Sequence, residues 1–280
     1  YQVIDCGGVE KWERWGDVTL LRPDPQAIWP MAAPAGIDAH YIRESGGGGR
    51  WQFNRSLPEK WQVHWRDLRF VVRPTGVKHT GLFPEQGVNW AWMQERIAGY
   101  QKEKGRPARV LNLFAYTGGA TVACLAAGAE VVHVDAAKGM VAWAKENAAL
   151  NGLQERPVRW IVDDVLKFVR REERRERLYD SIIMDPPSYG RGPGGEMWKL
   201  EDSVFDLIAA CEPILSEEPC FFLLNSYTTG LGATVLSNML QLILGRRRGG
   251  HVEAGEVGLP VERRAICLPC GTTGRWTPVD

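Results

Sequence analysis

The chain lacks the features that mark membrane and secreted proteins. No uninterrupted apolar run approaches the ~18 residues that span a bilayer, and residues 1–10 contain no apolar core of a signal peptide. Its 6 cysteines are dispersed over 280 residues instead of forming a compact disulfide framework. We therefore expect reduced thiols, no membrane partner and a cytoplasmic location, or an organelle matrix if a targeting segment once preceded Tyr1.

A net charge and a metal-binding pattern are also absent. Lys plus Arg and Asp plus Glu both number 34, so any polyanion must be bound by a local patch of charge. The basic runs at 170–177 and 246–248 could contact phosphates, although such runs are more often solvated helix ends. Cys267 and Cys270 form a CxxC without a second ligand pair at a zinc-site spacing, and the 5 histidines are dispersed. We expect no bound metal.

The composition itself is that of an ordinary globular protein, with 44% hydrophobic and 24% charged residues. The first third differs from the rest, because 8 of the 12 Trp lie there among short β-rich runs separated by Gly and Pro turns. This pattern predicts a small β-rich module over residues 1–76, with a flexible glycine loop at 46–49. Residues 77–280 are predicted to form a larger domain that begins with a helix over 86–104.

The larger domain alternates between two kinds of segment. Continuous apolar runs, typical of buried parallel strands, occur at 109–114, 130–134, 158–162, 181–184 and 220–224, and two closing strands follow. Helical patterns lie between them, from residue 119 and over 138–150, 165–177, 202–215 and 231–244. The alternation predicts an α/β fold: a doubly wound, mostly parallel, seven-stranded Rossmann-like sheet beside the β-rich N-terminal module.

The ends of the first two strands carry residues suited to a nucleoside ligand. In an open parallel sheet, ligands bind beyond the carboxyl ends of the strands, near the point where the strand order reverses. The first strand leads into Phe114-Ala115-Tyr116-Thr117-Gly118-Gly119, where adjacent glycines let the backbone approach a ligand. This is not the GxGxxG of dinucleotide-binding proteins, which disfavours a nicotinamide dehydrogenase. Asp135-Ala136 ends the second strand, where a carboxylate can accept hydrogen bonds from a ribose diol.

The third and fourth strand ends differ in how specifically their residues indicate a ligand site. The third, Val162-Asp163-Asp164-Val165, offers an acceptor for an adenine amino group and an apolar side chain for its ring, but a solvated acid is the commoner explanation. The fourth, Asp185-Pro186-Pro187-Ser188-Tyr189, is more distinctive because two prolines fix φ and remove two N–H donors. The Asp185 carboxylate and the Pro186 carbonyl can then accept hydrogens from a planar amine or amide, while Tyr189 stacks on its ring.

Taken in order, these four motifs resemble the class I S-adenosylmethionine-dependent methyltransferases. The likeness is greatest to the bacterial 23S ribosomal RNA methyltransferases that modify cytosine C5 or guanine N7, and it includes residues 80–86 before the leading helix. It implies S-adenosylmethionine as the cofactor and RNA as the partner. The cofactor-binding residues implied by the matched motifs are Gln86, Phe114, Ala115, Tyr116, Gly118, Gly119, Asp135, Ala136, Asp164, Val165 and Asp185.

Within that set, the resemblance implies particular roles. Gly118 and Gly119 would lie beside the methionine moiety and Asp135 at the ribose. Asp164 and Val165 would lie at the adenine, and Asp185 at the centre of methyl transfer, with Pro186 and Tyr189 as the other catalytic candidates.

The sequence departs from these relatives in two places. Cytosine-C5 methylation needs a cysteine thiolate after the fifth strand, where this chain has Leu224-Asn225-Ser226-Tyr227, and a serine without an adjacent base is a poor nucleophile. Residues 1–70 also do not match the small RNA-binding barrel of those enzymes. We therefore expect direct in-line methylation of a base nitrogen in ribosomal RNA, without a covalent enzyme intermediate. The alternatives are a cytosine-C5 enzyme, a protein or small-molecule N-methyltransferase, or a catalytically inactive RNA-binding or ribosome-assembly factor.

Overall fold

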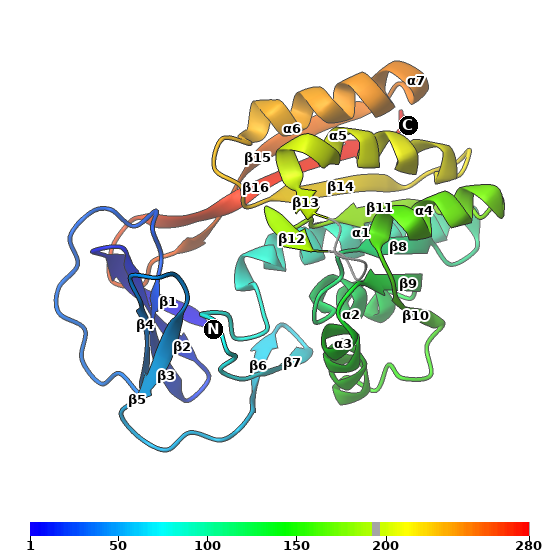
Figure 1. Ribbon diagram of the computed structural model, residues 1–280. Coiled ribbons are helices and arrows are strands. Elements are labelled where there is room, and N and C mark those ends of the chain that lie inside the picture. The colour runs from blue at the N-terminus through cyan, green and yellow to red at the C-terminus, as the bar shows by residue number, and fades with distance from the viewer. Residues whose placement is uncertain (192–196, 280) are drawn as a thin grey trace. The chain divides into compact units, whose positions relative to one another are not determined.

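The computed structural model describes residues 1–191 and 197–279, which divide into two compact units (Figure 1). One comprises Tyr1–Gly87 and Gly258–Cys270, and the other comprises Val88–Val257 and Gly271–Asp280. The domain boundary predicted after residue 76 stays a prediction. The compact units differ from it in assigning 77–87 and 258–270 to the first unit, where Val3 forms a β-bridge with Val261. No helix in the described part of the chain is long and apolar enough to cross a membrane.

The first unit is built on a five-stranded sheet with the order β1-β2-β3-β4-β5. Its strands are β1 (Gln2–Gly7), β2 (Glu10–Trp15), β3 (Val18–Pro23), β4 (Ala39–Arg43) and β5 (Gly49–Phe53). Neighbouring strands are antiparallel except for β3 and β4, which are parallel. A separate antiparallel pair follows, β6 (Trp61–Trp65) and β7 (Leu68–Val72). The predicted β-rich N-terminal module is thus confirmed.

The first unit contains a buried ion pair. The Arg22 Nε and Nη2 atoms donate to the two carboxylate oxygens of Glu13 at 2.6 and 2.7 Å, and the Tyr1 hydroxyl donates to the same group at 2.6 Å. Burial alone would raise the pKa of Glu13, but the adjacent Arg22 charge holds this pKa below its ordinary value. Arg22 Nη1 also donates to the Lys78 carbonyl at 2.9 Å, which fixes the segment that follows β7.

The second unit contains the predicted seven-stranded sheet, with the order β10-β9-β8-β11-β14-β16-β15. Its strands are β8 (Arg109–Leu113), β9 (Glu130–Asp135), β10 (Val158–Val162), β11 (Ser181–Met184), β14 (Phe221–Ser226), β15 (His251–Pro260) and β16 (Cys267–Thr277). The first five are mutually parallel, and β16 is antiparallel to β14. Because β9 and β10 extend the sheet to one side of β8 while β11 and β14 extend it to the other, the strand order reverses between β8 and β11.

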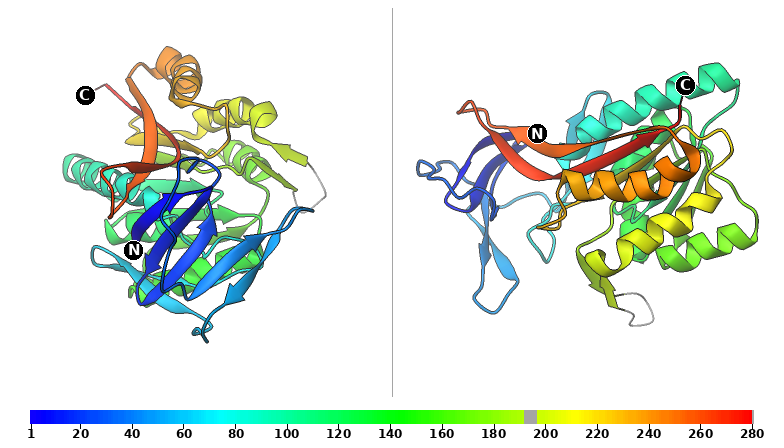
Figure 2. Two further views of the ribbon diagram at one scale, coloured as in Figure 1. Left: turned by 90° about the vertical axis from the view of Figure 1, so that its left-hand side faces the viewer. Right: turned by 90° about the horizontal axis from the view of Figure 1, so that it is seen from above.

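Helices cover both faces of this sheet (Figure 2). One face carries α1 (Gly87–Lys104), α2 (Gly119–Ala126) and α3 (Lys138–Leu150), and the other carries α4 (Val165–Arg174), α5 (Leu200–Cys211) and α6 (Ala233–Leu240). A π-helical segment, Gln241–Gly245, and α7 (Arg246–Arg248) continue α6. The main apolar core joins the parallel strands to α4, α5 and α6 through residues such as Ile182, Phe168 and Ile208. The doubly wound α/β fold is therefore confirmed.

A short hairpin between β11 and α5 was not predicted. It consists of β12 (Tyr189–Arg191) paired antiparallel with β13 (Met197–Lys199). Strands of three residues are too short to produce a readable period-two pattern. This hairpin begins directly after the Asp-Pro-Pro-Ser segment, so it belongs to the candidate site.

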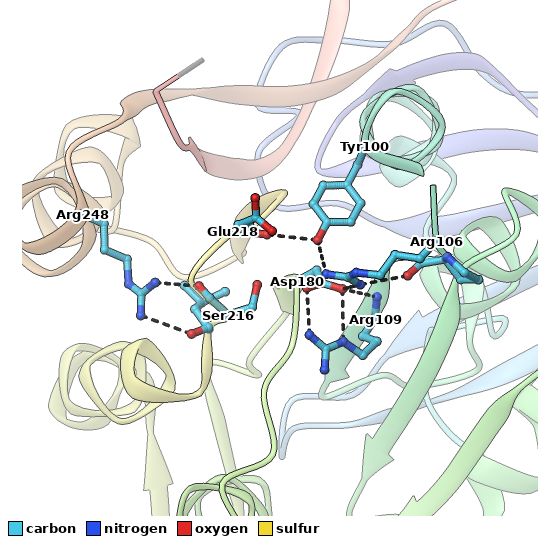
Figure 3. A network of polar contacts seen from close by, with 9 residues as sticks. Tyr100, Arg106, Arg109, Asp180, Ser216, Glu218 and Arg248 are labelled. Atoms are coloured by element: carbon cyan, nitrogen blue, oxygen red, sulfur yellow. Dashed lines mark hydrogen bonds and ion pairs between the residues drawn. The ribbon is translucent and has the colours of Figure 1, made fainter. Parts of the chain in front are cut away.

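The buried carboxylate of Asp180 holds two strands in register where they begin (Figure 3). Asp180 directly precedes β11, and its Oδ2 atom accepts hydrogen bonds from the Arg109 backbone N–H at 2.8 Å and from Arg106 Nη1 at 2.7 Å. Arg106 Nη2 donates to the Tyr100 hydroxyl at 2.6 Å, which donates to the Glu218 carbonyl at 3.0 Å. Burial would raise the pKa of Asp180, but the hydrogen bonds from Arg106 and Arg109 outweigh it and hold this pKa well below its usual range.

Arginines of the predicted basic run at 246–248 are engaged in internal contacts. Arg247 Nη1 and Arg248 Nε donate to the Glu212 carboxylate at 2.8 and 2.7 Å. Arg248 also donates to the Ser216 carbonyl at 2.8 Å (Figure 3). These contacts secure the end of the α6 to α7 segment against the loop before β14.

Replacing the buried carboxylate, Asp180→Asn, should lower the free energy of unfolding by about 2–4 kcal/mol at neutral pH. The expected loss is moderate because the Arg106 and Arg109 side chains are 39% and 41% exposed and can be hydrated when the carboxylate is absent. Since the folded pKa lies below the unfolded value of about 3.9, the carboxylate's contribution is complete above about pH 4 and declines as the pH falls further. Urea unfolding of the unaltered chain and the variant at pH 7 and pH 3 tests this. An equal difference in unfolding free energy between the two proteins at both pH values would contradict it.

Candidate functional site

The loop after β8 turns sharply around the carboxyl end of that strand. Ala115 N donates to the Val134 carbonyl of β9 at 3.0 Å, and Gly118 N donates to the Ala115 carbonyl at 3.0 Å. Phe114 and Tyr116 adopt left-handed backbone conformations, with φ of 55° and 52°. Residues other than glycine rarely adopt them, so contacts elsewhere in the loop must offset the strain.

Gly118 and Gly119 are required by how closely this loop packs. Gly118 has φ of 82°, and a Cβ atom there would lie 2.8 Å from the Cβ of Ala144 on α3. A Cβ atom at Gly119 would lie 2.7 Å from the Trp90 ring on α1. The turn leads directly into α2, so the N–H groups of the first helical turn lie beside the loop.

Asp135 joins the end of β9 to the same loop. Its Oδ2 atom accepts a hydrogen bond from Tyr116 N at 2.8 Å, and its Oδ1 atom accepts one from Ala137 N at 2.8 Å. Burial raises the pKa of Asp135, and the two backbone N–H groups oppose that rise. Each carboxylate oxygen has a second lone pair, so the group can still accept hydrogen bonds from a pair of hydroxyls. Ala136, which follows it, is exposed.

A buried polar chain supports the loop from below. Asn112 of β8 donates to the Thr121 hydroxyl at 3.0 Å, and Thr121 Oγ1 lies 2.8 Å from His133 Nδ1. The Thr121 hydroxyl thus joins the Asn112 amide to the His133 ring. Burial lowers the pKa of His133 to about 3, so the imidazole stays neutral at ordinary pH. His133 therefore supports the loop through its contact with Thr121.

The acidic residues after β10 have structural roles at that strand end. Asp164 is the N-cap of α4, because its Oδ1 atom accepts a hydrogen bond from Lys167 N at 2.9 Å. Asp163 Oδ1 accepts from Asp164 N at 2.8 Å, and its other oxygen pairs with Arg171. Val165 is 4% exposed and belongs to the apolar core. Adenine contacts from Asp164 and Val165 stay a prediction.

Asp185 leaves the sheet beside the loop after β8. Its backbone N–H donates to the Leu113 carbonyl at 3.4 Å, which continues the pairing of β11 with β8 by one residue. Pro186 is buried, and the Tyr189 side chain is 60% exposed on β12. The Ser188 hydroxyl accepts a hydrogen bond from Thr228 Oγ1 at 2.6 Å, so the segments after β11 and β14 are linked. The predicted strand-end residues of β8, β9 and β11 therefore share one edge of the sheet.

Trp198 is a site residue that the sequence analysis missed. Its indole N–H donates to the Pro187 carbonyl at 2.7 Å, and its ring lies 5.3 Å from that of Phe114 between centroids. Trp198 thus joins the Asp-Pro-Pro-Ser segment to the loop after β8. Its position opposite Gly190 in the β12–β13 hairpin is what brings it there, and a three-residue strand leaves no signal of this pairing in the sequence.

Gln86 lies in the first compact unit. It ends the 3₁₀ segment Pro84–Gln86, is 7% exposed, and its backbone N–H donates to the Phe83 carbonyl at 3.1 Å. Its role as a cofactor ligand stays a prediction. Within residues 1–191 and 197–279, no group of three or more His, Cys, Asp or Glu is placed to hold a metal ion.

These features define a class of protein, the doubly wound α/β proteins that bind a nucleoside-containing cofactor at the point where the strand order reverses. The residues fit an adenosyl group of that kind, because the half-buried Asp135 offers acceptors for a ribose diol and the glycine turn allows close backbone approach. The loop after β8 and Asp135 would hold the nucleoside side of the cofactor. The acceptor row from Asp185 would lie next to its reactive part.

Comparison with known proteins identifies the family. A family model described as S-adenosylmethionine-dependent methyltransferase matches residues 37–196. The crystal structure of the SAM-dependent methyltransferase from Agrobacterium tumefaciens is 37% identical, with a TM-score of 0.92 over 99% of this chain and 90% of that chain. The chain belongs to the S-adenosylmethionine-dependent methyltransferase family, and S-adenosylmethionine is the cofactor of that family.

Curated relatives are named for ribosomal RNA. The ribosomal RNA large subunit methyltransferase K/L of Shewanella baltica strain OS155 is 39% identical over 140 residues, which are 50% of this chain and 17% of the relative. The protein of the same name from Shewanella sp. strain ANA-3 is 38% identical over 187 residues, 63% of this chain and 24% of the relative. The chain thus spans about a quarter or less of these relatives' length. SMU.776 complexed with SAH, 19% identical with a TM-score of 0.74 over 96% of this chain and 72% of that chain, shares the fold.

Asp135→Asn should weaken binding of S-adenosylhomocysteine by about 10- to 100-fold, because the amide cannot accept at both positions and loses the charge that strengthens hydrogen bonds from hydroxyls. Isothermal titration calorimetry measures this. Glu130→Gln, at the opposite end of the same strand and exposed, is the matched control and should bind normally. A folded Asp135→Asn protein with unchanged affinity would remove Asp135 from the cofactor site.

Trp198→Phe keeps an aromatic ring against Phe114 but removes the N–H donor to the Pro187 carbonyl. We expect kcat for methylation to fall by about tenfold, as for the removal of one hydrogen bond of about 1.4 kcal/mol, with little change in S-adenosylhomocysteine affinity. Steady-state kinetics with parallel calorimetry separate the two quantities. An equal loss in both would show that Trp198 acts on the cofactor loop instead.

Proposed function

We propose that this protein transfers a methyl group from S-adenosylmethionine to a base nitrogen in ribosomal RNA. The observation that carries the proposal is the emergence of Asp185 beside the loop after β8, where the strand order reverses. The relatives named ribosomal RNA large subunit methyltransferase K/L support RNA as the substrate. A cytoplasmic location, where ribosomal RNA of bacteria is made, is part of the proposal.

The bound cofactor supplies a methyl group made electrophilic by its sulfonium. The task of the protein is then to position a nitrogen lone pair and to keep electron density on that nitrogen. The Asp185 carboxylate and the Pro186 carbonyl would accept the amine or amide hydrogens of the base. Trp198 and Thr228 hold this segment from two sides, through the Pro187 carbonyl and the Ser188 hydroxyl, so the acceptors are fixed before the substrate arrives. Tyr189, largely exposed, would stack on the base.

The environment of the cysteines favours nitrogen over cytosine C5 as the methyl acceptor. The C5 route needs a thiolate at the substrate. In the second unit Cys124 and Cys211 are fully buried, and burial raises the pKa of both thiols. Cys220 precedes β14, at the end of the strand opposite to Ser226, and burial raises its pKa to about 11. None of these thiols is suited to attack a base at the carboxyl edge of the sheet.

Asp185→Ala should lower the rate of RNA methylation by about two to three orders of magnitude, the usual cost of removing one preorganised electrostatic group. S-adenosylhomocysteine affinity should fall much less. The measurement is transfer of tritiated methyl groups to ribosomal RNA isolated from cells that lack the protein. Asp206→Ala, an exposed carboxylate on α5, is the matched control and should retain full activity. A near wild-type rate for Asp185→Ala would remove Asp185 from the mechanism.

Two further measurements separate the alternatives. RNA that contains 5-fluorocytidine should form no persistent covalent adduct with the protein, because direct attack by nitrogen needs no enzyme nucleophile. Calorimetric titration of the unaltered chain with S-adenosylhomocysteine should show binding. A covalent adduct would favour the cytosine-C5 enzyme, and absence of cofactor binding would favour an inactive RNA-binding or ribosome-assembly factor.

A further inference from the structure

Cationic side chains gather around the end of β3 in the first unit. Lys11 of β2 is the cross-strand neighbour of Arg22, and the Lys78 ammonium donates to the Pro23 carbonyl at 3.4 Å. Arg43 ends β4, which runs parallel to β3 and pairs with it. Since Arg22 also holds the Lys78 carbonyl at 2.9 Å, the backbone at Lys78 is fixed next to these strands.

Carboxylates balance part of this charge. Glu13 pairs with Arg22 at 2.6 Å, and Asp24 pairs with Lys11 at 3.2 Å. Lys78 and Arg43 form no ion pair with any residue that the structure describes. An ammonium group carries three donors, and the 3.4 Å contact to Pro23 is near the outer limit for one of them. Within the described chain, neither cationic group forms an ion pair, although the Asp24 carboxylate that pairs with Lys11 also acts on Lys78 from farther away.

The surroundings make this an electrostatically unfavourable arrangement for the protein alone. Burial and the charge of Lys11 lower the pKa of Lys78, the Asp24 carboxylate opposes them, and Arg43 adds to the decrease, which leaves this pKa at about 8. Burial and the nearby cations also lower the pKa of His79 to about 4, so His79 adds no charge at neutral pH. An anion with several acceptor oxygens would satisfy the free donors and reverse the repulsion. A phosphate group has that chemistry.

An exposed aromatic ring on the neighbouring strand β5, that of Phe53, points to a nucleic acid as the source of the phosphate. The Trp51 indole N–H donates to the carbonyls of Thr75 and Val77, at 2.9 and 3.3 Å, in the segment directly before Lys78. Its ring stacks with that of Phe53, which is 52% exposed. Single-stranded nucleic acids are bound by such combinations of cations for the phosphates and exposed rings for the bases.

We propose that Lys78 and Arg43 form a binding site for a backbone phosphate of single-stranded RNA, with Phe53 available to stack on an adjacent base. The inference rests on the proposed RNA substrate, and it names the residues of the first unit that contact that substrate. Lys11 completes the electrostatic surroundings while it stays paired with Asp24.

The salt dependence of RNA binding tests the site. Fluorescence anisotropy of a labelled, mixed-sequence single-stranded RNA gives the Kd of the full chain over about 50 to 200 mM salt. For a Lys78→Met, Arg43→Gln double variant, the slope of log K against log salt should become shallower by about 0.7 for each phosphate that the protein no longer neutralises. Affinity at low salt should fall by about tenfold. Lys78→Arg, which restores a cation, should retain most of the slope.

Arg50→Gln is the matched control, because Arg50 is an exposed arginine of β5 that already pairs with Glu44 at 2.8 Å. Its slope should equal that of the unaltered chain. Calorimetric S-adenosylhomocysteine binding and urea unfolding should be the same for all variants, since these side chains lie outside the cofactor residues. Equal slopes for the double variant and the control would overturn the site.

Two other outcomes are distinguishable. If inorganic phosphate at matched ionic strength binds in a manner that depends on Lys78 while the RNA slope does not change, the site takes a free anion and the RNA assignment is wrong. If the unaltered chain neither binds nor methylates RNA, the proposed function fails together with the site. If the chain methylates RNA but the double variant has an unchanged salt slope, only the proposed phosphate site is wrong.

Discussion

The geometry of the second unit depends on a buried carboxylate at the start of its parallel strands. Asp180 binds the backbone N–H and the side chain of Arg109, so β8 and β11 begin side by side. Strands that begin together and have similar lengths also end together, which brings the loop after Leu113 next to Asp185. A shift of one residue would turn every side chain of β11 to the opposite face. The alignment of the strands at the carboxyl edge of the sheet is thus set by contacts at the opposite edge.

Polar groups at the carboxyl edge serve the fold before they serve a ligand. Asp135 binds two backbone N–H groups, Asp164 caps α4, and the Pro187 carbonyl accepts from Trp198. The contact from Asp135 also holds strained backbone in place at the left-handed Tyr116. Rigid acceptors lose little entropy when a substrate binds, which is the condition for electrostatic preorganisation. The observed structural roles and the proposed functional roles therefore fall on the same atoms.

Charge in this protein is a local property. Equal numbers of acidic and basic residues leave no net charge, and the arginines at 247 and 248 both pair with Glu212. Lys78 and Arg43, which have no ion-pair partner among the described residues, lie apart in sequence and at positions that carry no basic run. Their charges act on each other because β3 and β4 are parallel neighbours and because Arg22 holds the Lys78 backbone.

The amino-acid sequence by itself determined the α/β class, the helix 138–150, the strand ends that carry Asp135 and Asp185, and the glycine turn. These features are readable because continuous apolar runs, and glycine or proline at fixed positions, are local signals. Only the tertiary structure decided that Val165 belongs to the core, that Trp198 reaches Phe114, and that 258–270 joins the first unit. It also brought Arg43 within electrostatic range of Lys78. Each of these depends on contacts between residues distant in sequence or on strands too short for a pattern. Such contacts are made by packing and strand pairing, which no local run of residues encodes.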